Sequence, residues 1–134
     1  RYEIPDYALR GEGEMFFRPM VMNNLYNQVR SYIWIDTSVE NRKYGFKDGC
    51  SRLVELDETI QLPAGYKLVS AAKDETMQGV GADFEGSLVQ KGNKVLLHNR
   101  LALKKRVYEA SDWESFRNAV NAHKAYGEYL VIKK

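Results

Sequence analysis

The sequence predicts an all-β fold, an antiparallel β-sandwich of about seven strands that carries one short C-terminal α-helix. Aromatic residues make up 12% of the 134 residues, a content that favours strands. Short runs of alternating apolar and polar residues, separated by turn residues, are typical of antiparallel strands with one buried face. Strands and helices do not alternate along the chain, which argues against an α/β layering.

Two runs define the clearest strands. In the first, one face carries Val54, Leu56, Ile60 and Leu62, and the other carries Glu55, Asp57, Thr59 and Gln61. In the second, one face carries Val95, Leu97, Leu101 and Leu103, and the other carries Lys94, His98, Arg100 and Lys104. Glu58 breaks the first alternation, and Leu96 and Asn99 break the second. Each run therefore predicts a strand with a buried and a solvated face.

Further strands are expected over residues 14–22, 30–36, 66–72, 82–90 and 128–133. Pro19 cannot donate a ladder hydrogen bond, so the first of these is expected to be broken or at an edge. Gly86 suggests a β-bulge. Leu62–Gly65 fits a type I turn with Pro63 at its second position, and Lys91–Asn93 fits a tight hairpin.

The one helical segment is predicted over residues 112–126. Ser111 followed three residues later by Glu114 has the pattern of a capping box. Trp113, Phe116 and Val120 follow at helical spacing and predict a buried stripe. The helix is expected to end near Gly127.

Length and charge limit the function classes. The 134 residues are expected to form a single domain over 1–134. The formal net charge of +2 does not indicate binding to nucleic acid. No apolar run approaches the roughly 20 residues that cross a bilayer, so no membrane insertion is expected. The first residues lack the pattern of a signal peptide, and we interpret the chain as cut from the C-terminus of a longer protein.

Three residues occur in the order of a cysteine catalytic triad, but their local contexts argue against one. Cys50 is the single cysteine, and the order Cys50, His98, Asp112 is the one that transglutaminase-like enzymes use. Such a nucleophile opens a helix, whereas Cys50 leads directly into a predicted strand. His98 lies on a polar strand face, and Asp112 is better explained by the start of the helix. We predict that the chain is not an enzyme and has no catalytic residue.

The sequence also predicts no metal and no cofactor. His98 and His123 are the two histidines, and we place them on different elements, a strand and a helix. A metal site would need them to converge with a carboxylate.

An ordered set of segments resembles a known family. The segments are Asn41–Tyr44 with Phe46, Ile60–Leu68 with its Leu-Pro-x-Gly-Tyr-Lys turn, Gly92–Val95, Leu101–Lys105, the helix from Asp112, and Leu130–Lys134. Over about residues 10–134 the chain is similar to the domain of unknown function at the C-terminus of many bacterial transglutaminase-like proteins. The resemblance implies an immunoglobulin-like sandwich placed after a catalytic domain in an exported polypeptide. It also implies an extracytoplasmic location, in the periplasm or cell envelope, and carries over no functional residue.

We therefore expect a non-catalytic accessory or interaction domain. Its partners would be neighbouring domains of the same polypeptide, and protein or glycan ligands. The contact surface is expected around Tyr32, Trp34 or the segment Met15–Met22. The alternative is a carbohydrate- or peptide-binding module that uses Trp34 and Trp113 as aromatic platforms. A cysteine-dependent hydrolase or acyl transferase is a weaker alternative.

Overall fold

The computed structural model describes residues 6–23, 33, 35–70 and 73–134. The elements, in chain order, are β1 (Leu9–Arg10), β2 (Glu14–Phe17), β3 (Phe46–Lys47), β4 (Arg52–Gln61), β5 (Lys67–Leu68), β6 (Lys73–Gln78), β7 (Ala82–Lys91), β8 (Lys94–Leu103), β9 (Val107–Tyr108), the 3₁₀ turn η1 (Ala110–Asp112), α2 (Trp113–Ala125) and β10 (Leu130–Lys133). A helical turn also covers residues 20–23.

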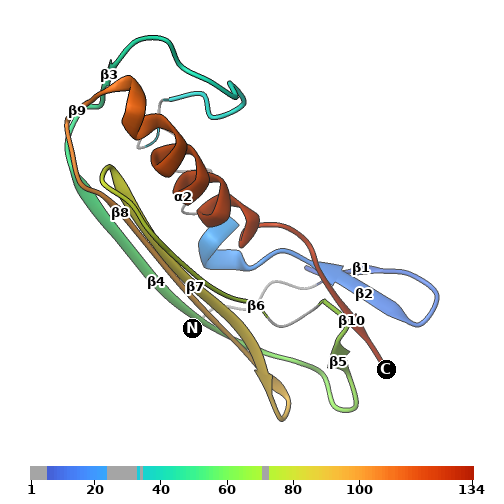
Figure 1. Ribbon diagram of the computed structural model, residues 1–134. Coiled ribbons are helices and arrows are strands. Elements are labelled where there is room, and N and C mark those ends of the chain that lie inside the picture. Colours follow the sequence, from blue (N-terminus) through green and yellow to red (C-terminus); the bar gives the residue numbers. More distant parts are fainter. Residues whose placement is uncertain (1–5, 24–32, 34, 71–72) are drawn as a thin grey trace.

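Four strands form what we call the long sheet, in the order β4-β8-β7-β6 and antiparallel throughout. β4, β7 and β8 each have ten residues, and the last two are joined by the expected tight hairpin. Helix α2 lies along one face of this sheet (Figure 1). Among the described residues no helix covers the other face, so the sheet has an inner face towards α2 and an outer face.

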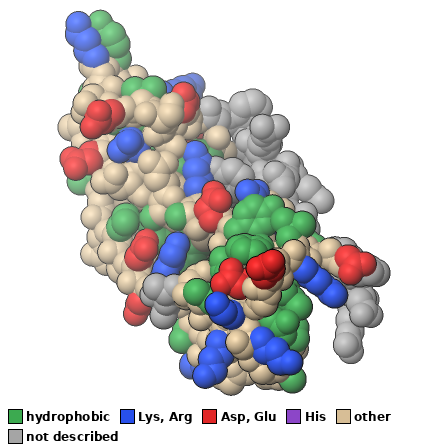
Figure 2. Space-filling model, turned by 90° about the vertical axis from the view of Figure 1, so that its right-hand side faces the viewer, with side chains coloured by type: hydrophobic (Ala, Val, Ile, Leu, Met, Phe, Trp, Pro, Cys, Tyr) green, Lys and Arg blue, Asp and Glu red, His purple; other side chains and the backbone are tan. Residues whose placement is uncertain are grey.

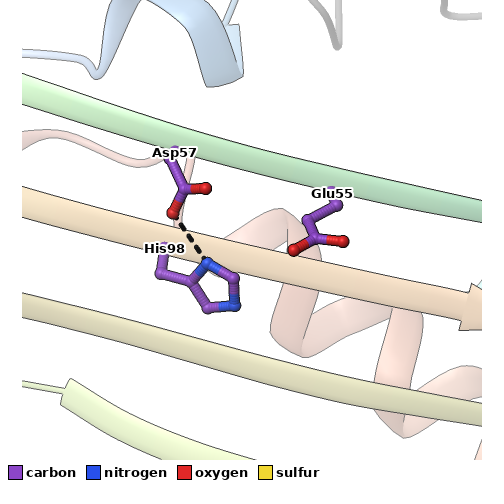
Figure 3. Close-up of side chains that lie close together, drawn as sticks. All are labelled: Glu55, Asp57 and His98. Carbon is purple, nitrogen blue, oxygen red and sulfur yellow. Dashed lines mark hydrogen bonds and ion pairs between the residues drawn. The ribbon is translucent and has the colours of Figure 1, made fainter.

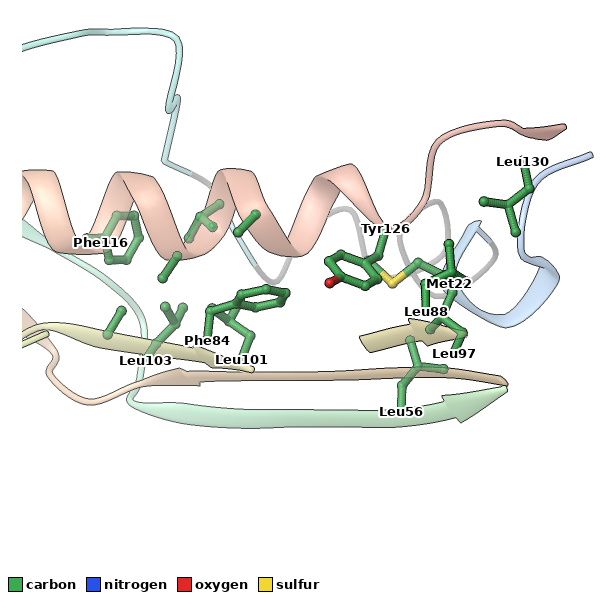
Figure 4. Close-up of a cluster of buried hydrophobic side chains, with 14 of the residues drawn as sticks. Met22, Leu56, Phe84, Leu88, Leu97, Leu101, Leu103, Phe116, Tyr126 and Leu130 are labelled. Carbon is green, nitrogen blue, oxygen red and sulfur yellow. The ribbon is translucent and has the colours of Figure 1, made fainter. Parts of the chain in front are cut away.

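The core fills the space between α2 and the inner face of the long sheet (Figure 4). Its side chains come from alternate positions of β7 and β8 and from one stripe of α2, and include Phe84, Leu88, Leu97, Leu101, Leu103, Phe116 and Val120. Met22, from the helical turn at 20–23, is fully buried beyond the C-terminal end of α2. The predicted inner faces of both alternating strands are confirmed.

An aromatic cluster closes the other end of the core. β3 pairs with β9, and Phe46 of β3 stacks on Tyr108 of β9 with ring centroids 4.6 Å apart. Phe116 of α2 meets both rings edge-on at 5.0 Å. Trp113 packs against the same group and donates its indole N–H to the carbonyl oxygen of Val39, 3.1 Å away. These contacts hold the loop before β3 against the start of the helix.

The remaining strands form the small sheet, in the order β1-β2-β10-β5. It lies beyond the C-terminal end of α2 and brings strands from both ends of the chain together (Figure 1). Phe17, Leu130 and Ile132 turn one face of this sheet into the common core.

The all-β, antiparallel, sandwich-like fold with one C-terminal helix is confirmed. α2 at Trp113–Ala125 agrees with the predicted span of 112–126. The described residues form ten strands where about seven were expected, because several pairings are only two residues long. β6 was missed, since its sequence Lys-Asp-Glu-Thr-Met-Gln has no apolar alternation and it depends on backbone pairing with β7.

Several local predictions need correction. The capping box at η1 uses Glu109 and Asp112 instead of Ser111 and Glu114, and Asp112 accepts from the Glu109 N–H at 2.9 Å. The turn after β4 lies one residue later than expected: Tyr66 N–H donates to Pro63 O, and Gly65 has a φ of 85°. That positive φ at the third position explains the glycine.

Gly86 does not mark a bulge, because it pairs regularly with Glu75 and Asn99. A Cβ atom at this position would lie 2.7 Å from the Tyr126 ring and 2.5 Å from the Phe84 ring. The glycine therefore makes room for an aromatic ring over the strand.

Two expected strands are shorter or different. β2 ends at Phe17, and residues 20–23 form a helical turn after Pro19. Of residues 30–36, the structure describes 33, 35 and 36, and these are not in a strand.

Candidate functional site

The outer face of the small sheet carries a line of apolar side chains. Leu9 pairs with Phe16, Phe16 pairs with Val131, and Val69 donates its N–H to Val131 O at 2.8 Å. We call these four residues the apolar row. Leu9 is 59% exposed and Val69 is 55% exposed, so the row faces solvent on one side of the molecule. It belongs to none of the core contacts that the other face of the sheet makes.

Charged and aromatic groups border the apolar row. On one side the Arg18 guanidinium lies over the Tyr129 ring at 4.5 Å. On the other, Lys133 pairs with Glu14 at 3.5 Å. Figure 2 shows this side of the molecule, where hydrophobic side chains gather among Lys, Arg, Asp and Glu side chains. An apolar centre with a charged rim is the usual composition of a protein contact surface.

The outer face of the long sheet is polar and contains a second constellation. Glu55 and Asp57 point outward from β4, and His98 of β8 lies directly opposite Asp57. The His98 Nδ1–H donates to Asp57 Oδ1 at 2.8 Å (Figure 3). One potential ligand atom from each of the three residues lies within 4.8 Å of the others. We call Glu55, Asp57 and His98 the histidine cluster.

The structure places the predicted contact residues as follows. Tyr32 and Trp34 lie outside the described residues. Within Met15–Met22, Met15 is partly buried and Met22 is fully buried, both facing the core. Phe16, between them, faces outward in the apolar row. Trp113 is only 3% exposed, so its ring is not available as an aromatic platform.

The structure does not bring Cys50, His98 and Asp112 together as a triad. Cys50 is exposed and precedes β4, whose residue Arg52 pairs with Leu103. His98 pairs with Asp57, five residues further along the same ladder, which corresponds to about 16 Å at a strand's rise per residue. Asp112 accepts from the Lys105 ammonium at 2.9 Å and from the Glu109 backbone. Cys50 is therefore beyond hydrogen-bond reach of His98.

His123 is buried in the core. Its Nδ1–H donates to Asn99 Oδ1 at 2.5 Å, across the space between α2 and β8. Burial lowers the pKa of His123 from 6.5 to about 4, so the imidazole is neutral at physiological pH. His98 of β8 points to the outer face of the long sheet, whereas His123 of α2 packs against its inner face. The two histidines therefore do not converge.

Comparison with known protein families shows to which family the chain belongs. The family model described as "Domain of Unknown Function with solved-structure structure (DUF3858)" matches residues 13–131. The chain belongs to the DUF3858 family. The match runs from the start of β2 into β10, so it includes the pairing that closes the small sheet. A comparison with curated proteins found no match.

One solved structure shares this fold. It is described as "a putative protease from Parabacteroides distasonis" and superposes with a TM-score of 0.71 at 14% identity. The superposition covers 92% of this DUF3858 chain but 24% of the Parabacteroides chain. The chain therefore spans about a quarter of the length of that protein. In the described part of the chain, no helix is long and apolar enough to cross a membrane.

Proposed function

We propose that this DUF3858 chain is a non-catalytic accessory domain that packs against a neighbouring domain of the same polypeptide. The contact surface is the apolar row on the outer face of the small sheet. The observation that carries the proposal is the exposure of Leu9 and Val69 at the two ends of a continuous apolar line, in a fold that spans 24% of a longer relative.

The size and charge of the apolar row, together with the greater length of the Parabacteroides protein, favour a neighbouring domain as its partner. A domain in the same polypeptide is already at high local concentration, so a patch of this modest extent is enough to hold it in place. The rim pairs, Arg18 with Glu128 and Lys133 with Glu14, combine both signs of charge and do not favour a strongly charged ligand. Inter-domain contacts typically combine apolar and polar groups in this way.

The wider setting is part of the same proposal. The sequence resemblance supports a parent protein that carries a transglutaminase-like domain upstream and is exported to the periplasm or cell envelope. The description of the Parabacteroides protein as a protease supports a proteolytic parent as the alternative, and Cys-His-Asp chemistry would serve that activity as well. An immunoglobulin-like description of the sandwich rests on the resemblance alone.

The sequence of the full-length gene product tests whether the chain belongs to an exported protein with an upstream catalytic domain. We expect an upstream domain with a Cys-His-Asp core and an export signal. A gene product that starts a few residues before Arg1 would contradict the accessory role.

The contact surface is tested by a matched pair of variants in that longer polypeptide. Leu9 and Leu53 are similarly exposed, at 59% and 55%, but lie on the outer faces of different sheets. Leu9→Lys should lower the free energy of unfolding by about 1–2 kcal/mol, because a partly exposed leucine would lose its apolar contact with the neighbour. Leu53→Lys should have little effect. Equal effects of the two variants, measured by chemical denaturation, would contradict the proposed contact surface.

A further inference from the structure

The histidine cluster occupies a rigid part of the outer face of the long sheet. Glu55 and Asp57 are two residues apart on β4 and therefore point to the same side. His98 comes from β8, which is paired along its length with both β4 and β7. Because all three backbones belong to one continuous ladder, their relative positions are fixed before any ligand binds.

The distances suit a small cation. Zn²⁺ holds nitrogen and oxygen ligands at about 2.0–2.2 Å in a tetrahedron, which places the ligand atoms about 3.4 Å apart. The candidate ligand atoms of the cluster lie within 4.8 Å of one another. Both carboxylates are on exposed side chains, so small rotations about their side-chain bonds can close the remaining gap.

The charges on the surrounding face also favour a cation. Arg100 lies between Glu55 and Glu85 in one cross-strand row, so one positive group faces two carboxylates. In the next row Asp57, His98 and Ser87 are followed by Asp74 of β6. The outer face around His98 therefore has an excess of negative charge, which attracts divalent cations.

The imidazole sets the chemical class of the ion. Carboxylates alone suit Mg²⁺ and Ca²⁺, which prefer oxygen ligands. A set of one imidazole nitrogen and two carboxylate oxygens suits Zn²⁺ and similar transition-metal ions. Three ligands leave the fourth tetrahedral position open to water.

We propose that Glu55, Asp57 and His98 bind a divalent transition-metal ion of the Zn²⁺ class on the outer face of the long sheet. This site is on a different sheet from the apolar row and is independent of the proposed contact with a neighbouring domain.

Isothermal titration calorimetry of the 134-residue chain with zinc chloride tests the proposal. The wild-type chain should bind one equivalent. Loss of a hydrogen-bonded partner of a ligating histidine typically weakens metal binding about 10- to 100-fold, so loss of the ligand itself in His98→Gln should weaken it at least about tenfold. Magnesium chloride should give much weaker heats than zinc chloride.

Glu85→Gln is the matched control, because Glu85 is a carboxylate on the same face but lies outside the cluster. It removes the same charge as Glu55→Gln. Glu55→Gln should weaken zinc binding strongly and Glu85→Gln only slightly. Absence of zinc binding, or equal weakening by these two variants, would overturn the proposal.

A second measurement separates coordination from general attraction. In nuclear magnetic resonance spectra, the ring nitrogens of His98 should shift on addition of Zn²⁺, whereas those of buried His123 should not. Zinc-dependent shifts that spare His98 would also overturn the proposal.

Discussion

The two four-stranded sheets differ most in their outer faces. Each sheet turns one face into the same core, and no helix in the described part of the chain covers the other face. The long sheet displays rows of charged and polar side chains, such as Glu55, Arg100 and Glu85. The small sheet displays Leu9, Phe16, Val131 and Val69. A charged face is stable in water, whereas an exposed apolar row is the feature on which the proposed contact with a neighbouring domain rests.

The largest effect should come from the inner face of the long sheet. Phe116 is fully buried and contacts Phe46 and Tyr108. Phe116→Ala should reduce the free energy of unfolding by about 3–5 kcal/mol through cavity formation, as measured by urea denaturation. Asn118→Ala, on the exposed side of the same helix, is the control and should change it by less than about 0.5 kcal/mol. Similar losses in both variants would mean that α2 does not cover this face.

The second effect is a dependence on pH that originates on the same inner face. The pKa of His123 is about 4 in the folded protein, below the value of 6.5 that a solvent-exposed histidine has in the unfolded chain. The unfolded chain therefore binds a proton first as the pH falls, and stability is lost between about pH 6.5 and 4. Lowering the pH from 7 to 4.5 should cost about 2–3 kcal/mol from this group.

Urea denaturation at the two pH values measures this loss. His123→Gln should show a smaller loss than the wild type, because it lacks the titrating group. If His123→Gln lost as much stability as the wild type, His123 would not be the group responsible.

A third effect tests how closely the ring of Tyr126 packs on the strand. Gly86→Ala should destabilise the fold by about 1–3 kcal/mol, because the new Cβ would overlap the Phe84 and Tyr126 rings. Ser87→Ala, at the next residue but on the outer face, should change stability by less than about 0.5 kcal/mol. Thermal denaturation of both variants would show the difference, and a neutral Gly86→Ala would contradict the close packing.

The smallest effect concerns the outer faces themselves. In the 134-residue chain alone, Leu9→Ser and Leu53→Ser should each change the free energy of unfolding by no more than about 0.5 kcal/mol. Chemical denaturation measures both. A much larger loss for Leu9→Ser in the chain alone would make the apolar row part of the core, and would contradict the proposal that it is a contact surface.

The sequence predicted three of the four strands of the long sheet, β4, β7 and β8, because period-two alternation directly reports which side chains are buried. The exceptions to that alternation are informative in the structure. Glu58 faces inward on β4 and accepts from the backbone N–H groups of Met20 and Val21, at 2.8 and 3.1 Å. Asn99 faces inward on β8 and binds His123. Glu58 connects the sheet to the helical turn at residues 20–23, and Asn99 connects it to α2. The apolar and polar alternation of a single strand does not predict which element such a residue will contact.

The small sheet and both surface sites could not be predicted in the same way. The apolar row depends on the pairing of β2 with β10, which lie at opposite ends of the chain, and on two strands of only two residues. Similarly, His98 meets Asp57 because of the β4–β8 register, and strand patterns do not fix the register between segments 41 residues apart. The inference that the two histidines do not converge was correct, but the meeting of one of them with two carboxylates was missed.

The closure of the small sheet by β10 has a consequence for how the chain folds during synthesis. β6, β7 and β8 are joined by short turns and can pair as soon as they leave the ribosome, whereas β2 can pair with β10 only after more than a hundred further residues have been synthesised. Until β10 emerges, Met15, Phe16 and Phe17 are an apolar segment without β10 beside it. Exposed apolar segments of this kind are prone to aggregate, so a chaperone would be most useful to this protein in the interval before β10 emerges.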